Sequence, residues 1–107
     1  MVKSKDEAIR IVKEFLDKIR LKYQIQSAYI FGSYIRGDPK EYSDIDLVVV
    51  LDKISKSNTL YNESFEIFHE AQKFDSIIEV LCIEKKEFDS SSEFIISQIK
   101  KNSIRVF

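Results

Sequence analysis

The stretch FGSYIRGDPKEYSDIDLVVV, residues 31–50, contains both glycines and the single proline of this 107-residue chain. Glycine adopts backbone conformations that are closed to other residues, and it lets a ligand approach the main chain closely. These turn-forming residues stand directly before two aspartates on an apolar run. Their concentration in one window predicts a loop whose shape serves a function.

The first half of this window has the features of an anion-binding turn. An apolar strand ends at Gly32, and a short helix can begin in the sequence SYIR that follows. Such a turn presents backbone N–H groups, the Ser33 hydroxyl and a positive helix end to an anion. Arg36 lies about one helical turn further on and can reach the same anion with its planar fork. A Gly-Ser dipeptide alone is more often an ordinary turn.

The second half places two carboxylates side by side. Alternate residues of a strand share a face, so Asp44 and Asp46 point the same way, about 6.6 Å apart at Cα. Such a pair is repulsive unless a positive charge lies between its members, and oxygen ligands with substrate phosphates suit Mg²⁺. An isolated Asp-x-Asp is more often a solvated strand end. The phosphate-binding turn one strand earlier favours a metal site here.

Composition limits the class of protein. The chain has 17 Lys and Arg against 18 acidic residues, and 44% of its residues are hydrophobic. We expect a single folded domain over residues 1–107, with no membrane association and no direct binding of nucleic acid. The single Cys82 cannot form an internal disulfide, and neither a signal peptide nor a membrane span is evident. The expected location is cytoplasmic.

Periodicity predicts alternating helices and strands. Ser4 and Glu7 have capping-box spacing, and the apolar repeat that follows predicts a helix to about Tyr23. A Ser90–Glu93 cap is expected to start a late helix. The expected strands cover residues 25–31, 43–51, 76–83 and an edge strand in 103–107, with a further helix over roughly 58–74. This order indicates a small α/β sandwich, a mixed sheet with helices packed on one face.

The apolar residues of the two later helices predict which sides are buried. The predicted buried stripe of helix 58–74 consists of Tyr61, Phe65, Phe68 and Ala71, and that of the last helix of Phe94, Ile95 and Ile99.

A third carboxylate is expected on the neighbouring strand, and two residues are candidates. Asp75 and Glu79 share a face by parity but lie about 13 Å apart, so only one can meet Asp44 and Asp46. Glu79 stands between Ile78 and Val80 in mid-strand, where an unpaired charge is costly to bury. Asp75 follows a helix end and is more simply a turn residue. Placement favours Glu79.

The motif GSYIRGDPKEYSDID resembles the signature of the DNA polymerase β-like nucleotidyltransferase superfamily, specifically its minimal nucleotidyltransferases (MNT). It has Gly-Ser, ten intervening residues and Asp-x-Asp, with Arg-Gly inside the gap. The segment IEVLCIEKKEF resembles the family's third strand, with Glu79 where the family often has Asp. The resemblance covers nearly the whole chain and implies the polymerase β-like α/β fold.

The resemblance also implies an activity and its residues. The family transfers a nucleoside monophosphate from a nucleoside triphosphate, here expected to be AMP from ATP. Two Mg²⁺ ions would be held by Asp44, Asp46 and Glu79. Gly32 and Ser33 would hold the β- and γ-phosphates, and Arg36 would offset the charge of the departing pyrophosphate.

Minimal family members are often encoded beside a helical HEPN protein, and they act as its antitoxin by adding AMP to one of its tyrosines. The resemblance therefore implies a HEPN-type toxin as partner and a toxin–antitoxin role. Two alternatives stay open: a non-catalytic module that neutralises its partner by complex formation, and an enzyme acting on a small hydroxyl compound.

Overall fold

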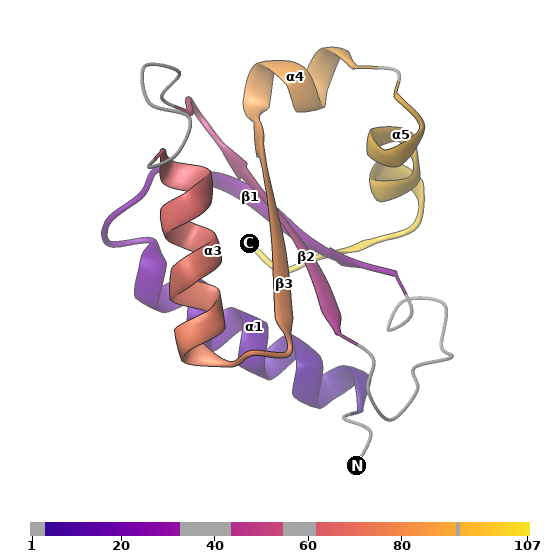
Figure 1. Cartoon of the computed structure of the whole chain (residues 1–107). Coiled ribbons are helices and arrows are strands. Elements are labelled where there is room, and N and C mark those ends of the chain that lie inside the picture. The colour runs from indigo at the N-terminus through magenta and orange to yellow at the C-terminus, as the bar shows by residue number, and fades with distance from the viewer. Residues whose placement is uncertain (1–3, 33–43, 55–61, 92) are drawn as a thin grey trace.

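The computed structural model describes residues 4–32, 44–54, 62–91 and 93–107. These residues form a four-stranded sheet flanked by helices (Figure 1). No helix in the described ranges is long and apolar enough to cross a membrane. The elements in chain order are α1 (Lys5–Ile19), β1 (Ile25–Phe31), β2 (Ile45–Leu51), α3 (Glu63–Phe74), β3 (Ile78–Glu84), α4 (Lys85–Ser90), α5 (Phe94–Lys101) and β4 (Ile104–Arg105).

The strand order is β3-β2-β1-β4. β1 pairs antiparallel with both β2 and β4, whereas β2 and β3 are parallel and are connected through α3. A parallel pair needs a crossover of this kind, because a tight turn cannot bring the chain back to the same end of the sheet. The predicted mixed sheet and the predicted short edge strand are both confirmed.

Helix α1 starts as predicted and ends earlier. The Ser4 hydroxyl accepts a hydrogen bond from the backbone N–H of Glu7 at 3.1 Å, which confirms the cap. The helix stops at Ile19 rather than near Tyr23, because the backbone N–H groups of Lys22 and Tyr23 both bond to the Ile19 carbonyl in a closing turn. The predicted bounds of β1 agree with the structure.

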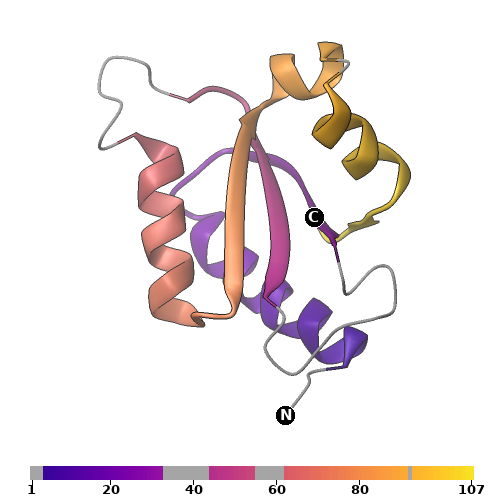
Figure 2. The same cartoon turned by 45° about the vertical axis from the view of Figure 1, so that its right-hand side comes forward.

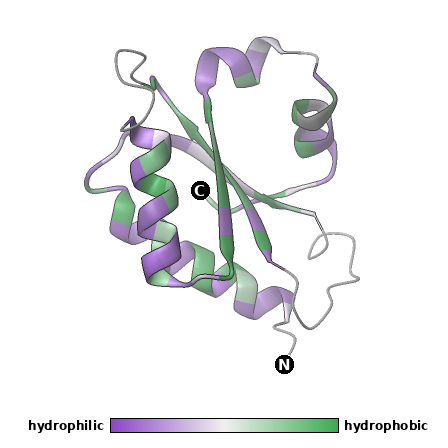
Figure 3. Cartoon of the chain, viewed as in Figure 1, coloured by the Kyte–Doolittle hydropathy of each residue, from purple (hydrophilic) through white to green (hydrophobic). Residues whose placement is uncertain are grey.

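Two apolar clusters lie on opposite faces of β2, which is why this strand is apolar almost throughout. One face packs on α1 and α3 through Ile45, Leu47, Val49 and Leu51. The other packs on α4 and α5 through Val48 and Val50. Figure 2 shows the two pairs of helices on the two sides of the sheet, and Figure 3 shows the apolar residues of the strands between them. The α/β class is confirmed, but helices cover both faces rather than one.

Helix α3 corrects two predictions. It begins at Glu63, where the Asn62 side chain caps the N–H of Phe65 at 3.2 Å, rather than near residue 58. Its buried residues are Ile67 and Ala71, whereas Phe65 and Phe68 are each 42% exposed. Residues 55–61, including Tyr61, lie outside the described part of the chain.

The C-terminal third contains a helix that periodicity did not predict. This is α4, and the Ser90 hydroxyl donates to the Lys86 carbonyl within it at 2.7 Å. Ser90 therefore does not cap the next helix, which begins at Phe94 without a side-chain cap. Phe94 is 79% exposed, contrary to prediction, while Ile99 is buried as predicted. The structure does not describe the side chain of Ile95, so its predicted burial stays a prediction.

Candidate active site

Two of the predicted carboxylates stand next to each other on neighbouring strands. Asp46 is the Cα partner of Glu79 in the parallel β2–β3 pair. It is also the partner of Phe31 in the antiparallel β1–β2 pair. Directly paired residues share a face, so Phe31, Asp46 and Glu79 form one row across three strands. This row lies on the sheet face that also carries α4 and α5, beyond the apolar residue Val48.

Gly32 ends β1 and makes room for the Asp46 carboxylate. Its φ is +83°, a left-handed conformation that residues with a side chain rarely adopt. A Cβ at this position would overlap Oδ2 of Asp46 and lie 3.2 Å from its Cγ. The carboxylate therefore occupies the space that a side chain at residue 32 would fill. The approach of Asp46 explains the glycine at position 32, whereas Gly37 and Pro39 lie outside the described residues.

Asp44 lies at the start of the same strand. It precedes β2 directly and is exposed. The next residue is anchored: the N–H of Ile45 donates to the Ile77 carbonyl at 2.8 Å, which ties the entrance of β2 to the turn before β3. Asp44 is thus held at the end of the sheet where Asp46 and Glu79 begin the row.

Asp75, the alternative to Glu79, has a structural role in the turn after α3. Its Oδ1 accepts a hydrogen bond from the N–H of Ile77 at 3.1 Å, and its carbonyl accepts from Ile78 at 3.0 Å. Asp75 precedes the first residue of β3 by three positions, so it lies outside the row that Asp46 and Glu79 share. The geometry thus places Glu79 beside Asp46, whereas Asp75 lies in the turn before β3.

The donors of the row are those that a hard cation prefers, because all are carboxylate oxygens. As their side chains lie, the described residues include no group of three His, Cys, Asp or Glu side chains close enough to hold a metal ion. Ser33 and Arg36, the other predicted phosphate contacts, fall in residues 33–43 and lie outside the described ranges.

One residue of the site was missed from the sequence. Phe31 lies directly beside Asp46 and packs at the edge of the second apolar cluster. Phe31 and Asp46 lie on different strands, so their pairing depends on how β1 and β2 align with each other. This alignment cannot be predicted from the sequence of either strand alone. The Gly32 turn was the available signal, since it ends β1 next to Phe31.

The sequence matches the family model described as a nucleotidyltransferase domain over residues 10–106. This chain belongs to the nucleotidyltransferase domain family. The match includes α1 from its second turn, the Gly32–Asp46–Glu79 region and β4.

Curated relatives of this nucleotidyltransferase come from Methanocaldococcus jannaschii. "Putative protein adenylyltransferase MJ0604" is 44% identical over 45 residues, which cover 40% of this chain and 45% of that protein. "Putative protein adenylyltransferase MJ1215" is 40% identical over 48 residues, covering 45% of this chain and 56% of that protein. The aligned part thus spans about half the length of these relatives.

Solved structures share the fold of this nucleotidyltransferase. A chain in the crystal structure of a toxin–antitoxin with AMP-PNP superposes with a TM-score of 0.64 at 18% identity, covering 92% of this chain and 72% of that one. A chain in the structure of the tri-AMPylated Shewanella oneidensis HEPN toxin with MNT antitoxin gives 0.55 at 18% identity, covering 96% and 71%. The α/β nucleotidyltransferase fold expected from the resemblance is confirmed, with helices on both faces of the sheet rather than one.

Proposed function

We propose that this chain is a Mg²⁺-dependent nucleotidyltransferase that transfers AMP from ATP to a hydroxyl of a partner protein. The observation that carries the proposal is the row at the Asp46 end of β2. Asp46 is seated against the Cα of Gly32 and lies in register with Glu79. A carboxylate pair at this place, next to a left-handed glycine turn, suits binding of a metal–triphosphate complex.

The metal would be held by Asp44, Asp46 and Glu79. Two of these acids are neighbours in the structure, and Asp44 stands two residues before Asp46 at the same strand end. All three supply oxygen donors, which fit Mg²⁺. When bound, a pair of such ions stabilises the attacking and leaving oxygens of an in-line displacement.

The protein residues position the reactants. The Gly32 turn, with Ser33 and Arg36, would bind the β- and γ-phosphates through N–H, hydroxyl and guanidinium donors. The acceptor oxygen forms a bond to the α-phosphorus, the bond to pyrophosphate breaks, and the hydroxyl proton passes to solvent. This chemistry requires positioning and electrostatics and no nucleophilic side chain of the enzyme.

The proposed partner is a HEPN-type protein, and the proposed role is that of the antitoxin. Support comes from the fold, which is shared with chains of HEPN–MNT complexes, and from relatives named as protein adenylyltransferases. An AMP group on a tyrosine adds negative charge and bulk, which would hinder binding of an RNA substrate. Because ATP is an intracellular substrate, the proposal places the reaction in the cytoplasm.

Calorimetric titration with ATP tests the site. Wild type should bind ATP with Mg²⁺ and much more weakly with EDTA, and the double variant Asp44→Asn/Asp46→Asn should lose the Mg²⁺ dependence. Asp52→Asn is a matched control, since Asp52 is an exposed acid just past the other end of β2, about 20 Å from Asp46. Equal ATP binding by all three proteins, with and without Mg²⁺, would remove the basis of the proposal.

A further inference from the structure

A second concave site lies on the same face of the sheet, at the end away from the active-site row. It has a volume of about 270 Å³, is open to solvent, and is lined by residues of β1, β2, α4 and β4. Its floor includes Ser27 and Val50, which are Cα partners on β1 and β2. Val50 is four residues from Asp46 along β2, about 13 Å. The cavity is therefore separate from the row of Phe31, Asp46 and Glu79.

The floor of the cavity contains a polar side chain, that of Ser27. Ser27 is only 7% exposed and is the one buried polar residue of the described chain. The residue lines the cavity, where its hydroxyl can donate a hydrogen bond to an anion. No buried side-chain oxygen or nitrogen of the described residues lacks a hydrogen-bond partner, so the Ser27 hydroxyl is an available donor and not a strained group.

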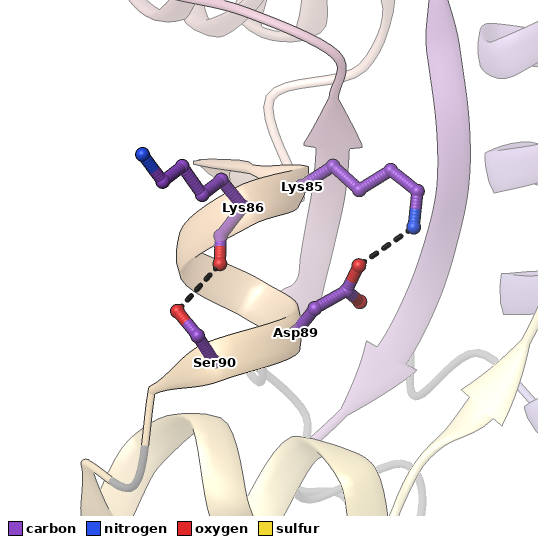
Figure 4. A network of polar contacts seen from close by, with 4 residues as sticks. All are labelled: Lys85, Lys86, Asp89 and Ser90. Carbon is purple, nitrogen blue, oxygen red and sulfur yellow. Dashed lines mark hydrogen bonds and ion pairs between the residues drawn. The ribbon is translucent and has the colours of Figure 1, made fainter.

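Two cations line the walls of the cavity. The Nε of Arg105 donates to the Phe107 carbonyl at 2.9 Å, which fixes the side chain and leaves the two Nη groups as a fork. Lys85 lies on α4, and its Nζ is 2.7 Å from Oδ2 of Asp89. Figure 4 shows this ion pair on the side of α4 that faces β1. With one acid and two cations, the lining carries a net charge of +1, although the whole chain carries −1.

An aromatic wall completes the site. Tyr29 and Phe88 both line the cavity, and their rings stack with centroids 5.4 Å apart and planes at 22°. This pair holds α4 against β1 and gives the cavity a fixed side. A volume of about 270 Å³ accommodates a phosphate, a diphosphate or a nucleoside monophosphate.

We propose that this cavity binds a small phosphate-bearing anion, held by the Arg105 fork, the Lys85 ammonium and the Ser27 hydroxyl. Planar guanidinium forks match phosphate oxygens in a bidentate manner, and charge-assisted hydrogen bonds are the strong ones. The Asp89 carboxylate is neutralised by Lys85 and keeps that ammonium in place. The site does not depend on the proposed activity, because none of its residues belongs to the active-site row.

The test is a titration of the ¹⁵N-labelled full-length chain followed by NMR, in buffer without Mg²⁺ so that metal-dependent binding at the row is suppressed. The probes are inorganic phosphate, pyrophosphate and AMP, one in each arm. Saturable shifts are expected at the amides of Ser27, Val50, Phe88 and Arg105. A tighter fit for pyrophosphate would indicate an inorganic ligand, and a tighter fit for AMP would indicate a nucleotide that contacts the Tyr29–Phe88 wall.

Variants distinguish a built site from general surface charge. Arg105→Gln should weaken binding about tenfold or more, and Ser27→Ala should weaken it several-fold with the fold intact. Lys86→Gln is the matched control, since it removes the same charge from α4 at a side chain that points away from β1 (Figure 4). Equal weakening by Lys86→Gln and Arg105→Gln, shifts confined to Gly32 and Asp46, or no saturable shift with any probe would each overturn the proposal.

Discussion

Gly32 and Asp46 form the contact on which the geometry of the candidate active site depends. Replacing Gly32 by Ala forces a side chain into a left-handed backbone, which costs about 1–2 kcal/mol, and drives the new Cβ into the Asp46 carboxylate. We expect Gly32→Ala to lose at least about tenfold in Mg²⁺-dependent turnover, beyond what a loss of stability explains. Turnover per folded molecule and the unfolding midpoint should be measured together. Unchanged turnover in the folded variant would show that the carboxylate does not need this space.

Glu79 lies beside Asp46 in the sheet and Asp75 does not, so substitutions of the two acids should differ in their effect on nucleotidyl transfer. Glu79→Gln removes a carboxylate beside Asp46, so we expect transfer to fall by about 100-fold or more while the unfolding midpoint is kept. Asp75→Asn keeps an acceptor oxygen for the Ile77 N–H and should be mild in both measurements. The reverse ranking of the two variants would move the third carboxylate to Asp75.

Cys82 is protected by its environment. Burial raises the pKa of its thiol to about 12. The unfolded chain ionises this thiol at a lower pH than the folded chain does, so ionisation favours unfolding. The free energy of unfolding is therefore unaffected by this thiol below about pH 9 and falls as the pH rises toward 12. At pH 8 the native protein should react with a disulfide reagent about three orders of magnitude more slowly than the unfolded chain. Labelling at comparable rates in the two states would contradict this pKa.

The helices of the C-terminal third show where sequence patterns are insufficient. In α5, Ile99 is fully buried against β2 while Phe94 is 79% exposed, although both were predicted to be buried. We expect Ile99→Ala to lower the free energy of unfolding by about 2–4 kcal/mol, and Phe94→Ala to change it by less than about 0.5 kcal/mol. Urea unfolding of both variants measures this difference. Similar losses for the two would place the buried side of α5 elsewhere.

The elements that were predicted well from the sequence are those whose local residues determine their structure. The Ser4 cap, β1 and the apolar run of β2 depend on local chemistry, namely a hydroxyl cap and β-branched residues. Helix α4 has only six residues and one buried side chain, Phe88, so no periodicity marks it. Its position comes from the packing of Phe88 on Tyr29, a contact between residues 59 positions apart. Helix α4 was missed for that reason, whereas the other helix of this layer, α5, was predicted without the face that it covers.

The candidate site was predicted in part by the same logic. Parity predicted that Asp44 and Asp46 share a face of a strand, and an expected buried mid-strand position favoured Glu79 over Asp75. In the structure Asp44 precedes β2, and Glu79 is the exposed second residue of β3. The neighbours across strands, Phe31 with Asp46 and Asp46 with Glu79, follow from register. Register is determined by packing on both faces of β2 and is not visible in a single strand.

At the scale of the whole molecule, the topology brings Gly32, Asp46 and Glu79 together at one end of one face of the sheet. The antiparallel β1–β2 pair carries Gly32 to Asp46, and the parallel crossover through α3 returns β3 beside β2 so that Glu79 joins them. Among the described residues, α4 and α5 pack on Val48 and Val50, further along β2 from the row.

The most direct measurement is the intact mass of a HEPN-type partner after incubation with this chain, ATP and Mg²⁺. The account predicts that the partner gains one or more AMP units. The gain should disappear with Asp44→Asn/Asp46→Asn and with EDTA, and it should persist with Asp52→Asn. A partner that keeps its mass yet is neutralised by forming a complex with this chain would contradict the account and establish a binding module instead.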